Sequence, residues 1–389
     1  MASNKKIYLD YAATTPIAEE AIALMLKYLG INGIFANSAS LQHDFGEQAY
    51  EAIEQARSEI ANLLNAKANQ LIFTSGATES NNLAIKGIAF SQQKRGKHIV
   101  TSATEHKSVL DTCNYLETVG FKVSYVRPNA EGMIDLAAVL NALTDETILV
   151  SLMHVNNETG VMQNIETLAQ TLQEREIFFH VDAAQSVGKL PIDLNQTPID
   201  LLSLSAHKFY GPKGIGCLYI RNRKKTLLTP LLHGGGQEYG LRSGTLPTHQ
   251  IVGMAKAFKI AHERMPTDTA HCHHLQQLLM QQLQQIDGVQ FNGDLQNKLP
   301  NILNVSFKHV TSDSLMLALK HEIALASGSA CNSGAIEASH VLRAMGIEGD
   351  RLYGAVRISF GRYTTEAEII RAGERIVEEV TRLRQLALE

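Results

Sequence analysis

The sequence lacks the features that mark secreted, membrane-spanning and disulfide-linked proteins. It has 4 cysteines in 389 residues, and no two of them form a CxxC pair, which favours a reducing environment. No apolar run approaches the roughly 20 residues that a bilayer-crossing helix needs. Residues 1–16 lack the apolar core of a secretory signal. We therefore expect a cytoplasmic protein that does not enter a membrane.

The chain also lacks a large excess of charge of either sign. It carries 35 basic and 39 acidic residues, for a formal net charge of -4, which argues against binding nucleic acid or a membrane through bulk charge. The short basic run at residues 221–225 is interpreted as a solvated turn. No Walker A lysine pattern is present, so a nucleoside triphosphate is not the expected ligand.

Seven apolar runs alternate with helical patterns between about residues 70 and 220. Such runs are typical of strands buried on both faces of a sheet, and the helices between them predict a largely parallel α/β sheet. The seven runs are QLIFTS, KHIVTSA, FKVSYV, TILVSLM, IFFHVD, LLSLSA and GCLYI. Ligand-binding side chains are then expected at the carboxyl ends of the strands.

The pattern changes beyond about residue 262. A helix over residues 251–263 is expected to join the two parts, and the runs NILNVSF, IALASGS and AVRISFG predict further strands. The last helix is expected to begin near Thr365, where Thr365 and Glu368 match the pattern of a capping box. Its apolar stripe comprises Ile369, Ala372, Ile376, Val380 and Leu383. This part is predicted to be a smaller α+β domain.

Three residues at the ends of neighbouring predicted strands suit pyridoxal phosphate. Lys208 follows LLSLSA, Asp182 ends IFFHVD, and Gln185 lies one turn later. An amine can form a Schiff base with the aldehyde of this cofactor, and a carboxylate can keep its ring nitrogen protonated. The amine must be available without its proton, and desolvation or nearby cations would lower its pKa accordingly.

Further polar groups lie at similar positions. The segment FTSGATESNN is a strand, a glycine turn and a helix start, where Ala77 and Thr78 could bind a phosphate or merely cap the helix. Ser205 and His207 could donate to the same phosphate. His106, at the end of KHIVTSA, could stack on a flat ring and transfer protons or be structural.

Three more candidate site residues lie elsewhere in the sequence. Two are in glycine-containing segments and one is in the predicted strand AVRISFG. Asn157 could hydrogen-bond a ring oxygen or a substrate carboxylate, and Arg357 could hold a carboxylate through two bonds. Thr245 lies in the loop GLRSGT.

The cysteines divide into two groups. Cys331 lies among small residues in SGSACNSGA, which favours a reactive thiol, whereas Cys113 and Cys217 are interpreted as core residues. Residues 271–274 read HCHH and could hold a metal ion. No partner motif supports that site, so a surface helix is the preferred interpretation.

With these motifs in place, the sequence closely resembles the cysteine desulfurases, in the IscS/NifS-like branch of the class V aminotransferases. The resemblance extends from YLDYAATTP to the last helix. Its other blocks are SGATESNNLAIKG, TEHKSVLDTC, MHVNNETG, HVDAAQSVGKLPIDL, SAHKFYGPKGIG, HGGG, LRSGTLP and SGSAC. It implies the aspartate-aminotransferase-like fold (PLP fold type I) in a homodimer. A large domain would span residues 16–262, and a small domain residues 1–15 and 263–389.

The resemblance also implies a role for each candidate. Lys208 would hold pyridoxal phosphate, Asp182 would pair with its ring nitrogen, and Gln185 would face its ring hydroxyl. His106 would stack on the ring. The phosphate would be bound by Ala77, Thr78, Ser205 and His207, with Thr245 from the second subunit. The substrate carboxylate would be held by Arg357, Asn157 and Asn37, although Asn37 precedes serine where the family often has proline.

The implied activity converts L-cysteine to L-alanine and leaves the sulfur on Cys331 as a persulfide. Sulfur acceptors would include an iron–sulfur scaffold protein and tRNA-thiolation proteins, without direct nucleic-acid binding. No intrinsic metal is implied, although Cys331 could transiently share a nascent cluster with the scaffold. The family's C-terminal tail continues past the last helix, whereas this sequence ends at Glu389, so scaffold docking has the least support. The alternative is a selenocysteine lyase or another enzyme of this fold, and an aminotransferase would not need Cys331.

Overall fold

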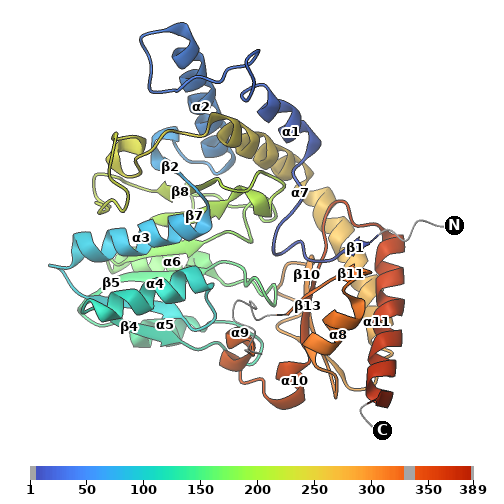
Figure 1. The fold of residues 1–389 in the computed structure, drawn as a ribbon. Coiled ribbons are helices and arrows are strands. Elements are labelled where there is room, and N and C mark those ends of the chain that lie inside the picture. Colours follow the sequence, from blue (N-terminus) through green and yellow to red (C-terminus); the bar gives the residue numbers. More distant parts are fainter. Residues whose placement is uncertain (1–5, 328–337, 387–389) are drawn as a thin grey trace.

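The computed structural model describes residues 6–327 and 338–386, in which two main sheets are covered by helices and a third sheet has only two short strands (Figure 1). In spatial order the larger sheet contains β2 (Leu71–Thr74), β8 (Gly216–Ile220), β7 (Leu201–Ser205), β6 (Phe178–Asp182), β5 (Thr147–Met153), β3 (His98–Ser102) and β4 (Lys122–Val126). All seven predicted strands are confirmed, and so is the mostly parallel sheet. The exception is β8, which runs antiparallel to both of its neighbours.

Apolar side chains on both faces bury the larger sheet. On β7, for example, Leu201 packs with one core and the adjacent Leu202 with the other, because successive side chains of a strand point to opposite faces. Helices that contribute to the two cores include α2 (Asp44–Leu63), α6 (Ile165–Glu174) and α7 (Thr248–Leu283) on one face, and α3 (Ala77–Gln92) and α4 (Lys107–Thr118) on the other. Cys113 and Cys217 are fully buried here, as predicted.

The smaller sheet is antiparallel and has the order β12 (Ala326–Ser327), β13 (Ala355–Ser359), β10 (Ile302–Phe307) and β9 (Val289–Asn292). Its core includes residues of α8 (Ser312–Leu319), α11 (Glu366–Leu386) and the second half of α7. The predicted capping box is present before α11, where Thr365 N donates to Glu368 Oε2 at 2.9 Å and Glu368 N donates to Thr365 Oγ1 at 3.2 Å. Strand β9 was not predicted.

The remaining elements are short. They are β1 (Ile7–Tyr8), which pairs with β11 (Ile323–Ala324), the helices α1 (Glu19–Leu26), α5 (Leu136–Ala142), α9 (His340–Ala344) and α10 (Gly349–Tyr353), and the 3-10 turns η1 (Ala68–Gln70), η2 (Ala206–Lys208) and η3 (Glu238–Gly240). Among the described residues, no helix is long and apolar enough to cross a membrane.

Helix α7 differs from the prediction because it does not end near residue 263. It continues through Pro266 to Leu283 as a single helix of 36 residues. Its first half packs against α1 and α2 and its second half against α11, so it links the two sheets (Figure 1). A proline normally breaks a helix because it lacks an N–H. Here the apolar residues on both sides of Pro266, such as Phe258 and Leu275, are buried in the two cores and hold the helix together.

Candidate active site

The candidate residues gather at the carboxyl ends of parallel strands in the larger sheet. Lys208 ends the turn η2, which follows β7 directly, and Asp182 is the last residue of the adjacent strand β6. The chain then turns back sharply at Tyr210, which has a positive φ of 67°, and Gly211. A Cβ on Gly211 would lie 2.8 Å from Ala206 Cβ, so only glycine fits this turn below Lys208.

Lys208 is held by the N-terminal segment of the chain. Its Nζ donates to Ala12 O at 2.6 Å and to Ala13 O at 2.8 Å. Burial and, to a smaller extent, the nearby Arg357 guanidinium lower the pKa of Lys208 to about 8, against the opposing effects of Asp182 and Asp10. Lys208 therefore loses its proton closer to neutral pH than an ordinary lysine does. This is the property that the sequence predicted for an amine that forms an imine.

Asp182 lies buried beneath this amine as an anchored hydrogen-bond acceptor. Its Oδ2 accepts from Asn81 Nδ2 at 2.8 Å, and its Oδ1 accepts from Ala184 N at 2.9 Å. Asn81 also donates to Ser108 Oγ at 2.9 Å. Asn81 was not predicted as a site residue, although it lies on α3 one turn after Ala77, where its side chain reaches the same strand ends.

His106 is the N-cap residue of α4 and interacts electrostatically with Asp182 and Lys208. Its Nδ1 accepts from Ser108 N at 3.1 Å, which leaves Nε2 as the nitrogen that carries the proton of the neutral ring. Desolvation lowers the pKa of His106. The ring is therefore mainly neutral at pH 7 and can either stack or exchange a proton at Nε2.

The start of α3 lies close to the end of β7, where the sequence predicted donors to an anion. The first backbone bond of α3 joins Ser80 N to Gly76 O, so the preceding amides of Ala77 and Thr78 lie before the intrahelical bonds begin. Gly76 has a φ of 152°, and a Cβ there would lie 3.4 Å from Ser205 Oγ. The two elements therefore converge closely enough for Ser205 and the free amides to contact one anion.

His207 faces the N-terminal segment from the same turn. Its Nδ1 lies 3.1 Å from Thr14 Oγ1. Burial and, to a smaller extent, the nearby Lys208 lower the pKa of His207 to about 4. His207 is therefore neutral at pH 7 and would act as a hydrogen-bond partner rather than as a cation.

Arg357, on strand β13, places a side chain from the smaller sheet at the candidate site. Its guanidinium donates to Asp10 Oδ1 at 2.8 Å and to Asn157 O at 2.9 Å. Its Nε is buried without a hydrogen-bond partner in the described part of the chain. A buried, unsatisfied donor on a cation is the kind of group that a carboxylate ligand satisfies. Asp10 was not predicted, because a carboxylate near the N-terminus shows no pattern linking it to Arg357.

For two of the predicted residues, no described contact leads to this cluster, and a third cannot be placed. Asn37 is exposed, and its Oδ1 accepts from Ala39 N at 3.0 Å. Thr245 is exposed in the loop after η3, and no described contact joins it to Lys208. Cys331 lies outside the described residues.

The HCHH run lies on α7, as the preferred interpretation expected, but it is not wholly on the surface. Cys272 is buried in the core of the smaller sheet. His271 Nε2 lies 2.9 Å from Thr364 O, and His274 Nε2 lies 3.1 Å from Glu366 Oε2. Across residues 6–327 and 338–386, no three His, Cys, Asp or Glu side chains form a metal-binding group.

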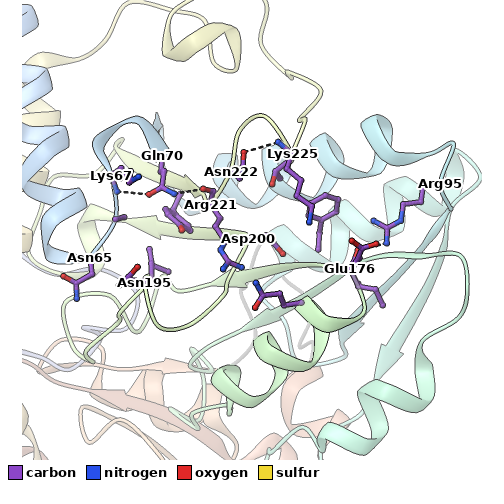
Figure 2. Close-up of a pocket in the computed structure, with 17 residues that line it drawn as sticks. Asn65, Lys67, Gln70, Arg95, Glu176, Asn195, Asp200, Arg221, Asn222 and Lys225 are labelled. Carbon is purple, nitrogen blue, oxygen red and sulfur yellow. Dashed lines mark hydrogen bonds between the residues drawn. The ribbon is translucent and has the colours of Figure 1, made fainter.

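A cavity of about 490 Å³ lies at the other end of the strands (Figure 2). Phe178, the first residue of β6, and Asp200, which precedes β7, are among the residues that line it. The cationic side chains in its wall are Lys67, Arg95, Arg221 and Lys225. None of the predicted site residues lines it, so it is separate from the cluster around Lys208.

Comparisons with known proteins agree with this geometry. Residues 7–371 match the family described as aminotransferase class-V. The chain is 52% identical over 381 residues to "Cysteine desulfurase IscS" of Buchnera aphidicola subsp. Acyrthosiphon pisum, covering 98% of this chain and 94% of that protein. The protein of the same name from Vibrio campbellii is 51% identical, with the same coverage.

Solved structures give the same result. A "NIFS-LIKE PROTEIN" superposes with a TM-score of 0.90 at 36% identity, covering 97% of this chain and all (100%) of that one. "SspA in complex with cysteine" superposes with a TM-score of 0.81 at 41% identity, covering 93% of this chain and 100% of that one. The chain therefore belongs to the aminotransferase class-V family, within its IscS- and NifS-like cysteine desulfurase branch.

Proposed function

We propose that the chain is a pyridoxal-phosphate-dependent cysteine desulfurase, which converts L-cysteine to L-alanine and transfers the sulfur to Cys331. The observation that carries this proposal is the cluster of a low-pKa amine at Lys208, a buried carboxylate at Asp182 and a cation at Arg357, in a chain 52% identical to cysteine desulfurases over nearly its whole length. The similar SspA structure is a complex with cysteine, which supports cysteine as the substrate.

The described residues fit this cofactor. Asp182 is buried and anchored, as a partner for a ring nitrogen should be. The amides at the start of α3, with Ser205, offer donors to a phosphate. When bound, pyridoxal phosphate supplies a reactive aldehyde and a ring that withdraws electrons from the substrate. Lys208 would hold its aldehyde carbon, His106 would lie against the ring, and Gln185 would face the ring oxygen.

Different side chains would then carry out different steps of the reaction. Arg357 would bind the carboxylate of cysteine, with Asn157 and Asn37 beside it, and so orient the substrate Cα. Lys208 would remove the Cα proton, because its lowered pKa leaves a useful fraction of free amine near neutral pH. The Cys331 thiolate would attack the substrate sulfur and keep it as a persulfide. The substrate C–S bond would break with its electron pair left on the carbon skeleton, which gains a proton there and leaves as alanine.

We expect cofactor loading to depend on pH through Lys208. The neutral amine is the reactive form, so loading should increase as the pH rises and level off above about 8, where the pKa of Lys208 lies. At pH 6 the loading rate should be about one-hundredth of the plateau, since each pH unit below the pKa lowers the free amine about tenfold. Stopped-flow absorbance after mixing the unloaded protein with the cofactor measures this. A rate that keeps rising tenfold per unit beyond pH 9 would contradict it.

Arg357→Lys should raise KM for cysteine more than it lowers kcat. Lysine keeps a cation beside Asp10 but loses the two-bond geometry, and the loss in kcat/KM should be roughly 30-fold, which corresponds to about 2 kcal/mol. Steady-state alanine production measures the effect. Arg382→Ala, at an exposed arginine on α11, is the matched control and should behave as the parent. An unchanged KM for Arg357→Lys would remove Arg357 from the substrate site.

The test of the activity is a product balance. Incubation with L-cysteine and a thiol reductant should yield alanine and sulfide in equal amounts, and L-selenocysteine should be compared under the same conditions. Turnover of selenocysteine alone would replace the proposal with a selenocysteine lyase. Production of neither alanine nor sulfide would refute both.

We also propose how the chain is organised and where it acts. The separate cores of the two sheets support a large domain over residues 16–262 and a small domain over residues 1–15 and 263–389, with the boundary inside α7. The exposed position of Thr245 supports its donation to the phosphate site of a second copy in a homodimer. We propose a cytoplasmic role in supplying sulfur to an iron–sulfur scaffold, which the likeness to IscS proteins supports, and tRNA thiolation is the second proposed route.

A further inference from the structure

Lys189 lies directly behind the candidate cofactor site, next to Gln185. Its Nζ donates to Gln185 Oε1 at 3.1 Å and to the backbone oxygen of Gln185 at 3.1 Å. The turn that carries both residues is packed tightly against the segment after Lys208, because a Cβ on Gly188 would lie 2.8 Å from Phe209 Cβ. The contact between Lys189 and Gln185 therefore has a fixed place relative to Lys208.

The contact matches only one of the two possible orientations of the Gln185 amide. The two ends of a glutamine amide have nearly the same shape but opposite hydrogen-bonding character. With Oε1 held by Lys189, the opposite end of the amide donates from Nε2 to Ala12 O at 2.8 Å. Ala12 O also accepts from Lys208 Nζ at 2.6 Å. The amide N–H groups therefore lie on the side of Lys208, and the amide oxygen lies away from it.

We propose that Lys189 is a positioning residue, which orients the Gln185 amide so that an N–H group rather than an oxygen faces the ring oxygen of pyridoxal phosphate. The inference rests on the proposed function, since it concerns how the same site treats its cofactor. An N–H donor stabilises the ionised ring oxygen, whereas a carbonyl oxygen in the same place would repel it.

The surroundings of Lys189 suit a fixed donor. The titratable groups that face it from the packed elements are Lys208 and His207 on η2 and Cys272 on α7. Burial lowers the pKa of Lys189 to about 7. Both the charged and the neutral amine can donate an N–H, so the orientation of Gln185 persists on both sides of neutral pH.

A double-mutant cycle on the loaded protein tests the inference without measuring turnover. The readout is the apparent pKa of the visible absorbance of the bound cofactor, titrated from pH 5 to pH 10. Lys189→Met should raise this apparent pKa by about one unit, because a hydrogen bond to a charged oxygen is worth roughly that much. Gln185→Met should raise it similarly. The double variant should match Gln185→Met alone, because Lys189 acts through Gln185.

Other outcomes would overturn the inference. Shifts that add in the double variant would mean that Lys189 acts through its charge alone, and a parent-like titration of Lys189→Met would mean that it does not act at all. Lys189→Arg retains a donor and should return the apparent pKa toward that of the parent, which separates positioning from damage to folding. A parent protein that takes up no coloured cofactor would instead refute the proposed function itself.

Discussion

Lys208→Ala is expected to abolish the visible absorbance of the protein and nearly all alanine production. Lys208 is the amine whose Nζ faces the carbonyls of Ala12 and Ala13 at the carboxyl end of β7. It would both hold the cofactor covalently and move the Cα proton. Loss of proton transfer alone should lower kcat by roughly 10²- to 10⁴-fold, and loss of the covalent link adds to this.

The measurements are an absorbance spectrum and an alanine assay of each purified protein after incubation with the cofactor. Lys224→Ala, at an exposed lysine after β8, is the matched control and should keep both properties. Removing a partly buried cation should not unfold the chain, because burial disfavours the charge that Lys208 carries at neutral pH. A coloured, active Lys208→Ala protein would refute the assignment of Lys208.

Cys331→Ala is expected to separate cofactor chemistry from sulfur transfer. The variant should still take up the cofactor and bind cysteine with a spectral change, because Lys208, Asp182 and Arg357 remain unchanged in it. It should release sulfide at less than roughly one-thousandth of the parent rate, because the substrate sulfur then has no nucleophile to attack it.

The matched control for this prediction is Cys113→Ala. Burial raises the pKa of the Cys113 thiol to about 12, so it is an inert core group that should be dispensable for turnover. Sulfide and alanine are measured for both variants in the presence of reductant. Parent-like sulfide release by Cys331→Ala would show that another group accepts the sulfur.

The sequence predicted the larger sheet well because apolar runs buried on both faces are distinctive. The direction of β8 was not predicted. The connection from β7 to β8 spans only residues 206–215, which is too short for the helical crossover that parallel strands need, so the spacing already contained this information. The helix predicted over residues 251–263 continues to Leu283, and the burial of both halves of α7 in the two cores explains its continuity.

The residues of the candidate site also fall into those that the sequence predicted and those that it did not. Side chains with distinctive chemistry at strand ends, such as Lys208 and Asp182, were predicted from their positions. The partners that tune them were not. Ala12 and Ala13 act through backbone carbonyls, which have no sequence signature, and Asp10 contacts Arg357 across 347 positions of the chain. Lys189 is a lysine in a turn, and only its contact with Gln185 distinguishes it.

The most direct test of the proposed activity is to follow the sulfur atom from the substrate to the protein. The loaded protein is incubated with ³⁵S-labelled cysteine without reductant, digested, and its peptides are analysed by radiolabel and mass. We expect label on the peptide that contains Cys331, released by reductant, together with an equal amount of alanine. Label on a different peptide, or alanine without any label on the protein, would contradict sulfur transfer to Cys331.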